Sequence, residues 1–527
     1  MSEAKGKCIL AVDLGTGGPK VALVTTRGEV LAHEFEETPL ILLPGGGAEQ
    51  KPADWWQAIT TASSRLMARG LVPVSDVAGV CCTSQWSGTV AVGPDGEPLF
   101  NAIIWMDSRG ARYIREMVDG PMTIEGYSIA KLRRWIKLTG GVPTRSGKDP
   151  IAHILWLKNE HPEIYDRTYK FLEPKDYLNL RLTGEYGSSF DSITLHWVTD
   201  NRDITDVTYS PKLLRWSGID PDKLPELTPV AAVVGKLRPA AAEELGIPAG
   251  VPVVSGTPDV PGAALGSGAV RDFESHLYVG TSSWLTCHVP FKKTSLLHSM
   301  AALPSAIPGR YFVANEQETA GACVKFFRDN ILFSDDALAA KGERPDYYQG
   351  LNAIAAAAPP GSDKVLFLPW LYGERTPVDD HSVRGGFYNV SLKTTRAHLA
   401  RSIFEGVAYN SKWLLGYLEK FCGREMNPIH YIGGGANSAV WCQIFADVFD
   451  RTIRQVRDPI EANVRGAGLQ GAMGLELTGL DEVAEGIAVE QEYAPNPDNR
   501  GIYDELFGEF LTVYKKNKRI HARLNAS

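Results

Sequence analysis

The segment Cys8–Leu31, CILAVDLGTGGPKVALVTTRGEVL, limits the possible folds of this chain more than any other. Its apolar runs Ile9–Val12 and Val21–Thr25 flank the turn Gly15-Thr16-Gly17-Gly18, which predicts a β-hairpin. Asp13 ends the first run, where an unpaired carboxylate would be costly, so we expect it to face a metal, a donor or an open cleft. Glycines leave the backbone N–H groups of such a turn uncovered, and the resulting concavity suits a phosphate. Taken alone, however, the segment is better explained as an ordinary hairpin in which Asp13 forms the turn.

A similar pattern recurs in Ser275–Val289, near the start of the second half of the chain. There the short apolar strand His276–Val279 leads into Gly280-Thr281 and then into another strand. Two such hairpins, one near the start of each half, predict a duplicated architecture that faces one cleft. Hairpins that approach one polyphosphate from opposite sides would form a nucleotide clamp.

Length and composition narrow the class of protein. A chain of 527 residues exceeds the size of a single core, so we expect two or more domains. The net charge of −8 argues against a general nucleic-acid surface and permits a small-molecule enzyme. The cysteines are scattered, odd in number and without a CxxC pair, which is typical of a reduced protein. Because neither a signal peptide nor an apolar run long enough for a bilayer is present, we expect a cytoplasmic protein.

Polar and aromatic side chains follow two predicted strands in the first half. One group comes after the apolar strand Val77–Thr83 and the other after Ile103-Ile104. The ends of strands in α/β folds are where ligands bind, and a stacking face, an acceptor and a forked donor suit a polyhydroxylated ligand. The side chains are Gln85, Trp86, Ser87, Trp105, Asp107 and Arg109. It is equally open that Asp107 and Arg109 only pair with each other or cap the helix that follows.

A third polar position, Asp259, follows the short apolar strand Val251–Ser255 and the loop Gly256-Thr257-Pro258. A helix of small residues is expected from Pro261. A carboxylate just before a helix N-terminus can be held ionised by the helix dipole and can act as a general base. As a lone observation, an N-cap aspartate is the better explanation.

The glycine loop Gly433-Gly434-Gly435-Ala436-Asn437-Ser438 lies between the predicted strand His430–Ile432 and the predicted helix Ala439–Phe449. A glycine loop at a helix start exposes backbone N–H groups and leaves a flat surface on which a purine could lie.

Three other segments are expected to be loops. Glu49 and Gln50 precede the helix that begins at Pro52 and are expected to be exposed. Leu366–Leu392 is rich in glycine, proline and charge, and long ordered loops of this kind are often functional. Gly141–Asp149 looks like a P-loop, but it has one residue too many and an Asp where Ser or Thr must reach Mg²⁺.

Taken in order, the motifs DLGTGGPK, WMDSR, GTPD, GTSS, GERTPVDD, GGGANSAVWCQIFAD and EA…GA resemble those of the FGGY family of carbohydrate kinases. The resemblance runs from about Cys8 to about Leu477 and is strongest to the xylulose-kinase branch, because of PWLYGERTP and EQKPADWW. It implies an α/β protein with two actin-like (ribonuclease H-like) domains, residues 1–268 and 269–527, on either side of a deep cleft for nucleotide and sugar.

The resemblance also implies roles for residues, with ATP and Mg²⁺ as cofactors. The first hairpin would bind phosphates through Asp13, Gly15, Thr16 and Lys20, and the second through Gly280, Thr281 and Ser282. Gly434, Gly435, Ala436 and Asn437 would border the adenosine. Asp259 would be the catalytic base, and Asp13 would hold the metal directly or through water. The implied reaction is phosphorylation of a primary hydroxyl of a small ketose, such as the pentulose D-xylulose.

Two departures from the family pattern leave the sugar open. Gln85-Trp86-Ser87-Gly88 stands where xylulose kinases typically carry Gln-Met-His-Gly, and Val260 stands where they place Asn. Since hydrogen-bonding groups decide sugar choice strongly, ribulose, erythritol or glycerol is also possible. A sugar-sensing regulator or a chaperone could use the same hairpins. A glycoside hydrolase that pairs Asp107 with Asp259 fits less well, since it has no use for two phosphate hairpins.

The expected partners are therefore the nucleotide and a small sugar or polyol, without nucleic acid or membrane. A homodimer is allowed.

Overall fold

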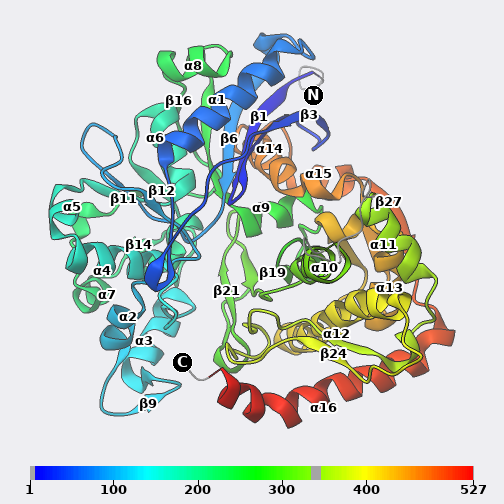
Figure 1. Ribbon diagram of the computed structural model, residues 1–527. Helices are drawn as coiled ribbons and strands as arrows, with labels where there is room; N and C mark the ends of the chain where they lie inside the picture. The colour runs from blue at the N-terminus through cyan, green and yellow to red at the C-terminus, as the bar shows by residue number, and fades with distance from the viewer. Residues whose placement is uncertain (1–5, 334–345, 526–527) are drawn as a thin grey trace.

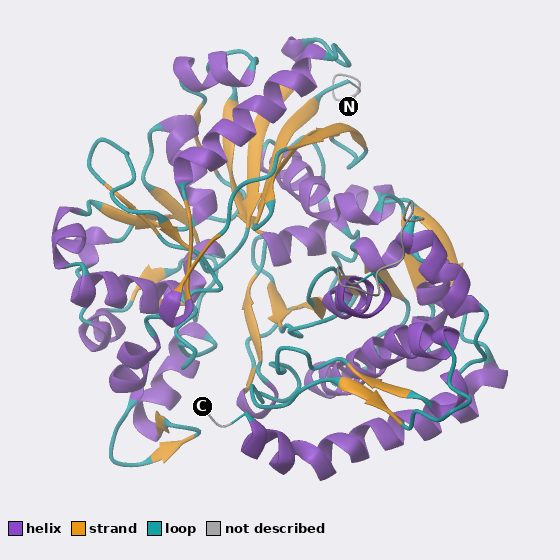
Figure 2. Cartoon of the chain, viewed as in Figure 1, coloured by secondary structure: helices purple, strands orange, loops and turns teal. Residues whose placement is uncertain are grey.

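The fold is described from a computed structural model, which describes residues 6–333 and 346–525. Figure 1 shows two lobes, with the N-terminal half of the chain, in blue to green, at the upper left and the C-terminal half, in green to red, at the lower right. Figure 2 shows that strands lie inside each lobe and that helices cover them. No helix in the described part of the chain is long and apolar enough to cross a membrane.

The main sheet of the first lobe has the strand order β16-β17-β6-β1-β2-β3. Its strands are β1 Cys8–Gly15, β2 Gly18–Thr25, β3 Val30–Phe35, β6 Val77–Ser84, β16 Val233–Lys236 and β17 Pro252–Pro258. The strands β1, β2 and β3 pair antiparallel, β6 and β17 continue the sheet in parallel with β1, and β16 closes it antiparallel. The predicted first hairpin is therefore confirmed at the centre of this sheet.

The main sheet of the second lobe has the order β20-β21-β22-β19-β18-β25-β26-β27. Its strands are β18 Ser275–Val279, β19 Ser283–Val289, β20 Thr294–Ser295, β21 Met300–Pro304, β22 Tyr311–Ala314, β25 Ile429–Ile432, β26 Ile453–Val456 and β27 Val489–Tyr493. From β22 to β27 the sequence of antiparallel and parallel pairs is the same as from β3 to β16 in the first lobe. The duplicated architecture predicted from the two hairpins is confirmed.

The helices cover both sheets and fill the connections. Those of the first lobe are α1 Pro52–Ala68, α2 Ala111–Val118, α3 Ile129–Thr139, α4 Pro150–Glu160, α5 Pro162–Arg167, α6 Pro174–Thr183, α7 Pro211–Ser217, α8 Pro239–Leu245 and α9 Asp259–Gly266. Those of the second are α10 Gly321–Phe327, α11 Tyr347–Ala356, α12 Arg396–Cys422, α13 Ala439–Phe449, α14 Ala462–Gly474, α15 Leu480–Gly486 and α16 Arg500–Leu524. Short strands complete the chain: β4 Ile41–Leu43, β5 Gly47–Gln50, β7 Val90–Val92, β8 Ala102–Ile103, β9 Thr123–Ile124, β10 Tyr127–Ser128, β11 Lys170–Leu172, β12 Gly187–Ser189, β13 Thr199–Asp200, β14 Thr208–Tyr209, β15 Glu226–Thr228, β23 Leu366–Leu368 and β24 Gly386–Tyr388.

Local sequence explains why the long helix α12 begins and ends where it does. The Thr395 hydroxyl accepts a hydrogen bond from the N–H of His398, so one of the free donors of the first turn is satisfied. At the other end Gly423 adopts a left-handed conformation with φ of 71°, which an L-residue with a side chain rarely adopts.

Two loop predictions are wrong. Glu49 and Gln50 lie in β5 and are 3% and 0% exposed. Leu366–Leu392 is not a continuous loop, because β23 and β24 pair antiparallel near its two ends. The partners of β5 are β4 and β8, which lie outside the predicted loop, whereas β23 and β24 pair across the interior of their own segment, so local polarity gives the wrong answer in both cases.

The two lobes meet where α9 crosses α14. The helix α14 follows β26 of the second sheet, yet it packs on the first: a Cβ on Gly468 would meet Val24 of β2. At the crossing itself the contact is between backbones. A Cβ on Gly266 would lie 1.7 Å from the carbonyl oxygen of Ala462, and one on Gly466 would lie 1.9 Å from that of Gly262. The predicted domain boundary between residues 268 and 269 falls just after α9, and it stays a prediction.

Gly466→Ala should therefore force the two helices apart and lower the free energy of unfolding by about 2 kcal/mol or more. Gly416 of α12 is a matched control, because a Cβ there meets nothing within 4 Å. Gly416→Ala should raise the free energy of unfolding by about 0.5–1 kcal/mol. Urea unfolding of both variants measures the difference, and equal effects would contradict a backbone contact at the crossing.

Candidate active site between the lobes

The first hairpin ends in the tight turn Thr16-Gly17, where Gly15 pairs with Gly18. Gly18 has a φ of 138°, and a Cβ there would lie 1.9 Å from the carbonyl oxygen of Glu36, so only glycine fits. Gly17 is exposed and has open space where a side chain would be. The tip of this hairpin is thus bare backbone, as expected of a surface that approaches a phosphate.

Asp13 lies opposite Lys20 across this hairpin. Its Oδ1 is buried and has no hydrogen-bond partner among the described residues. The pKa of this carboxyl is raised to about 6, mainly by burial and to a smaller extent by the charge of Glu461. The charge of Lys20 and a hydrogen bond with Asn463 act in the opposite direction and lower the pKa. The prediction that Asp13 faces a donor, a metal or a cleft agrees with this free oxygen.

Lys20 connects the first hairpin to the second lobe. Its ammonium lies 3.1 Å from Glu461 Oε2 and donates to the carbonyl oxygen of Ile460 at 2.9 Å. Glu461 also lies 3.4 Å from His33 Nδ1. The start of α14 is therefore held against the first hairpin.

Asp259 is the first residue of α9, and Pro258 occupies the N-cap. Its Oδ1 accepts a hydrogen bond from the N–H of the adjacent Val260 at 2.9 Å, rather than from the second or third helical N–H as an N-cap would. The N-cap interpretation is therefore wrong. The expectation that the helix dipole keeps it ionised is also wrong, because burial and then the charges of Asp13 and Glu316 raise its pKa to about 8.

The second hairpin and the glycine loop lie next to each other. Within the turn, the N–H of Gly280 donates to the carbonyl oxygen of Ser282 at 2.9 Å. The carbonyl oxygen of Thr281 accepts the N–H of Ala320 at 2.9 Å, so the start of α10 supports the turn. A Cβ on Gly433 would lie 2.6 Å from the carbonyl oxygen of Val279, which brings the loop that contains Gly434, Gly435, Ala436 and Asn437 against β18.

A chain of side-chain hydrogen bonds connects the first hairpin to the predicted sugar residues. The Thr16 hydroxyl donates to Gln85 Oε1 at 3.2 Å and accepts from Trp105 Nε1 at 2.9 Å. Gln85 Nε2 donates to Gln50 Oε1 at 2.7 Å, and Gln50 Nε2 donates to the carbonyl oxygen of Thr16 at 2.9 Å. The structure thus brings Thr16, Gln85 and Trp105 together, and it adds Gln50, which the sequence alone did not indicate.

The neighbouring Trp86 and Ser87 use their polar atoms within the lobe. Trp86 Nε1 donates to the carbonyl oxygen of Ser192 at 3.0 Å, and its ring lies 6.0 Å from that of Phe312. The Ser87 hydroxyl donates to the carbonyl oxygen of Lys148 at 2.8 Å. What Trp86 can offer a ligand is therefore its half-buried ring, not its N–H.

Asp107 and Arg109 pair with each other, which is the alternative left open by the sequence. Arg109 Nε lies 2.8 Å from Asp107 Oδ2, which also accepts the N–H of Ala48 at 2.9 Å. Arg109 Nη2 reaches Glu49 Oε1 at 2.6 Å, and its guanidinium lies 3.8 Å from the ring centroid of Trp156. A contact of either side chain with a sugar stays a prediction.

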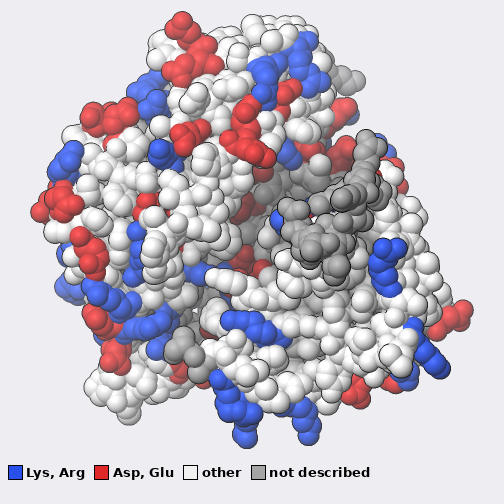
Figure 3. All heavy atoms as spheres, in the orientation of Figure 1, with Lys and Arg blue, Asp and Glu red and all other residues white. Residues whose placement is uncertain are grey.

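Charged residues of the second lobe, to which the sequence analysis gave no role, lie near these groups, and the charge of Glu316 acts on Asp259. Arg375 Nη2 lies 2.8 Å from Glu318 Oε1, and Arg375 also pairs with Glu316. Burial and then the charge of Arg375 lower the pKa of Lys148, which belongs to the first lobe and lies 5.7 Å from the ring of Tyr372 in the second. Figure 3 shows acidic side chains inside the hollow between the lobes. The sequence feature that could have indicated Glu316 and Glu318 as site residues is their position just after the apolar strand β22.

The sequence was compared with models of known protein families. Models of the N-terminal and C-terminal domains of the FGGY family of carbohydrate kinases match residues 8–266 and 277–475. The chain belongs to this family. It is therefore a sugar phosphotransferase, and as a kinase it uses ATP.

Relatives of this kinase differ in their named sugars. The xylulose kinase of Staphylococcus epidermidis is 27% identical over 98% of both chains. The gluconokinase of Bacillus subtilis is 26% identical over 96% of this chain and 95% of that one. Crystal structures of a ligand-bound xylulose kinase and of a gluconate kinase, both from Lactobacillus acidophilus, superpose with TM-scores of 0.84 at 24% identity. The superposition on the xylulose kinase covers 98% of this chain and 100% of that one, and the superposition on the gluconate kinase covers 98% of this chain and 99% of that one. The family and the two-lobed fold implied by the motifs are confirmed.

The residues of the kinase suit a magnesium ion that arrives with the nucleotide. Among the described residues no group of three or more His, Cys, Asp or Glu side chains could hold a metal ion by itself. Mg²⁺ usually takes one or two carboxylates together with substrate phosphates and water. The unpartnered Oδ1 of Asp13, in the first hairpin, fits that requirement.

The raised pKa of Asp259 predicts a cost to stability. Between about pH 4, where the carboxyl ionises in the unfolded chain, and about pH 8, the folded kinase holds a proton that the unfolded chain has lost, so its stability falls as the pH rises. Asp259→Asn removes this dependence. The free energy of unfolding of Asp259→Asn should exceed that of the wild type by an amount that grows between pH 5 and pH 8 to about 1–3 kcal/mol. The difference stays within this range because water screens a half-buried group.

Asp203→Asn is the control for this urea titration. A hydrogen bond from the Thr205 hydroxyl lowers the pKa of Asp203, so its replacement should reduce stability at neutral pH. A gain for Asp259→Asn that is the same at pH 5 and pH 8 would contradict the raised pKa.

Proposed function

We propose that this kinase transfers the γ-phosphoryl group of ATP to a primary hydroxyl of a small neutral ketose, a pentulose such as D-xylulose. The observation that carries the proposal is the place of Asp259. Its carboxylate lies close enough to the phosphate hairpin for Asp13 to raise its pKa, and that pKa, at about 8, suits a general base near neutral pH.

In this mechanism the ionised Asp259 accepts the proton of the sugar hydroxyl while the hydroxyl oxygen attacks the γ-phosphorus in line. The backbone N–H groups of Gly15-Thr16-Gly17 and Gly280-Thr281-Ser282 would bind the phosphate oxygens from the two lobes. Lys20 would add a positive charge from the first hairpin. Mg²⁺ that is bound together with ATP would neutralise part of the phosphate charge, and Asp13 would hold this ion.

The glycine loop is the proposed adenosine site. Gly434 has open space where a side chain would be, and Gln455 Nε2 fixes the loop by donating to the carbonyl oxygen of Ala436 at 2.7 Å. The loop lies against β18, whose hairpin is proposed to bind the phosphates. A base on Gly434, Gly435 and Asn437 would therefore be next to its own phosphate chain.

The charges of the site favour a neutral sugar over an aldonic acid. Carboxylates are gathered here, and two of the cations beside them already have acidic partners: Arg375 pairs with Glu316 and Glu318, and Lys20 with Glu461. A sugar carboxylate would meet these carboxylates, and like charges disfavour a wrong ligand. Val260 and the ring of Trp86 add apolar surface on the sugar side.

The first test is ADP release from Mg·ATP with a panel of ketoses and polyols. One neutral sugar should stimulate release, and Asp259→Asn should lower kcat by about 10²–10⁴-fold without loss of ATP binding, because a general base contributes that much. The kcat/KM for the sugar should rise with pH up to about 8, as the base ionises. ATP binding without stimulation by any sugar would favour a sensor, and an active Asp259→Asn would place the base elsewhere.

The second test compares acceptors of different charge. D-Gluconate should give less than about a hundredth of the kcat/KM of the best ketopentose, which corresponds to roughly 2.7 kcal/mol of discrimination. Ribulose, erythritol and glycerol are the neutral comparisons. A kinase that prefers D-gluconate would contradict the argument from charge, and it would leave the argument for Asp259 intact.

A further inference from the structure

A buried ammonium lies at the centre of the first lobe and has no role in the proposed reaction. Lys175, the second residue of α6, is 1% exposed. Its Nζ contacts Asp176, donates to the Ser189 hydroxyl at 3.1 Å and donates to the carbonyl oxygen of Ser255 at 2.9 Å. Burying a charge costs free energy of folding unless the charge is paired and hydrogen-bonded, so the position of Lys175 depends on all of these partners.

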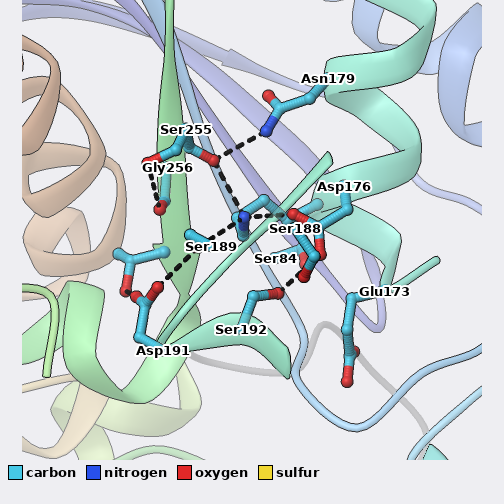
Figure 4. A network of polar contacts seen from close by, with 12 residues as sticks. Ser84, Glu173, Asp176, Asn179, Ser188, Ser189, Asp191, Ser192, Ser255 and Gly256 are labelled. Atoms are coloured by element: carbon cyan, nitrogen blue, oxygen red, sulfur yellow. Dashed lines mark hydrogen bonds and ion pairs between the residues drawn. The ribbon is translucent and has the colours of Figure 1, made fainter. Parts of the chain in front are cut away.

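The cluster holds strand β17 on both sides of an irregularity. Asn179 Nδ2 also donates to the carbonyl oxygen of Ser255, at 2.7 Å. Two residues later the Thr257 hydroxyl donates to Asp191 at 2.6 Å, and Asp191 in turn accepts the Ser189 hydroxyl at 2.6 Å. Figure 4 shows Asn179 and Asp191 reaching this strand from different segments of the lobe.

The irregularity itself is Gly256. Its φ is 71°, a Cβ there would lie 1.9 Å from the carbonyl oxygen of Cys82, and the register of β17 against β6 shifts between Val254 and Thr257. Asp259 follows three residues after Gly256. The hydrogen bonds to Ser255 and Thr257 therefore fix the bend that decides where the Asp259 carboxylate lies.

The same cluster reaches the predicted sugar segment. The Ser192 hydroxyl donates to Asp176 Oδ2 at 2.8 Å, while the carbonyl oxygen of Ser192 accepts Trp86 Nε1 at 3.0 Å. The N–H of Gly88 donates to Glu173 Oε2, at the start of α6, at 2.9 Å. One buried network thus holds both the strand that leads to Asp259 and the segment that contains Trp86.

We propose that the Lys175 cluster is a positioning device, which fixes the Asp259 carboxylate relative to the sugar segment 85–88 without touching the substrate. This inference rests on the proposed function. Lys175, Asn179, Asp191 and Thr257 are then positioning residues. Reacting groups must be held to within a fraction of an ångström, and a misplacement of 1 Å can cost about 10²-fold in rate.

Thr257→Val tests the inference, because it removes the hydroxyl and nearly keeps the shape. It is preferred to Lys175→Met, which would leave Asp176 buried without its cation and is expected to unfold the lobe. Thr168→Val is the matched control. The Thr168 residue is 2% exposed, and its hydroxyl donates to the carbonyl oxygen of Ile164 at 2.7 Å, away from β17.

The readouts are kcat and KM for sugar phosphorylation, and ADP release without sugar. Thr257→Val should lower kcat about 10- to 100-fold. Its KM for ATP and its sugar-independent ADP release should stay close to the wild-type values, since neither needs an aligned sugar hydroxyl. Thr257→Ser, which restores the hydroxyl, should recover most of kcat. Thr168→Val should keep the wild-type kcat.

Three results would overturn the inference. Equal kcat for Thr257→Val and Thr168→Val in soluble, folded protein would show that the bond to Asp191 serves stability alone. A lowered kcat that Thr257→Ser does not restore would assign the effect to shape. If no sugar in the panel stimulates ADP release by the wild type, the proposed function is overturned, and the inference with it. This outcome is distinct from the other two, because it concerns the wild type alone.

Discussion

The contact between α9 and α14, backbone against backbone, is the constraint on which the rest of this structure depends. Glycines at the crossing let the two helices approach closely, and each helix begins at the site. The first residue of α9 is Asp259, and Glu461 and Asn463 lie at the start of α14. Because the crossing fixes both helix starts, it also fixes which charges surround the first hairpin.

The electrostatics of the site follow from that arrangement. Asp13 lies in β1, and Asp259 directly follows β17 of the same sheet. Burial raises the pKa of both carboxyls, and the charge of Asp13 raises that of Asp259 further. Lys20 is the nearby cation, but it is also paired with Glu461 of the other lobe. The site therefore gathers negative charge, which costs folding stability and suits a nucleotide that arrives with a cation.

The sequence predicted what depends on local pattern. Both hairpins, the helix α13 and the strand before Asp259 could be read from runs of apolar residues and from glycine positions, because these signals lie within a few neighbouring residues. The ordered set of motifs predicted the family. The burial of Glu49 and Gln50, the ion pair of Arg109 with Glu49 and the pKa of Asp259 could not be predicted, because their causes are partners distant in sequence. The same is true of the burial of Lys175, whose partners Ser189 and Ser255 are also distant in sequence.

A joint made of glycine backbones has a mechanical consequence. Interlocked side chains resist sliding, since they must leave their sockets before two helices can turn. At Gly266 and Gly466 the contact surface carries no side chains, so the two backbones lie directly against each other. The rest of α14 lies on the first sheet, where a Cβ on Gly468 would meet Val24. We therefore expect α14 to move with the first lobe when the angle between the lobes changes, so that Glu461 and Asn463 stay beside Asp13 and Asp259.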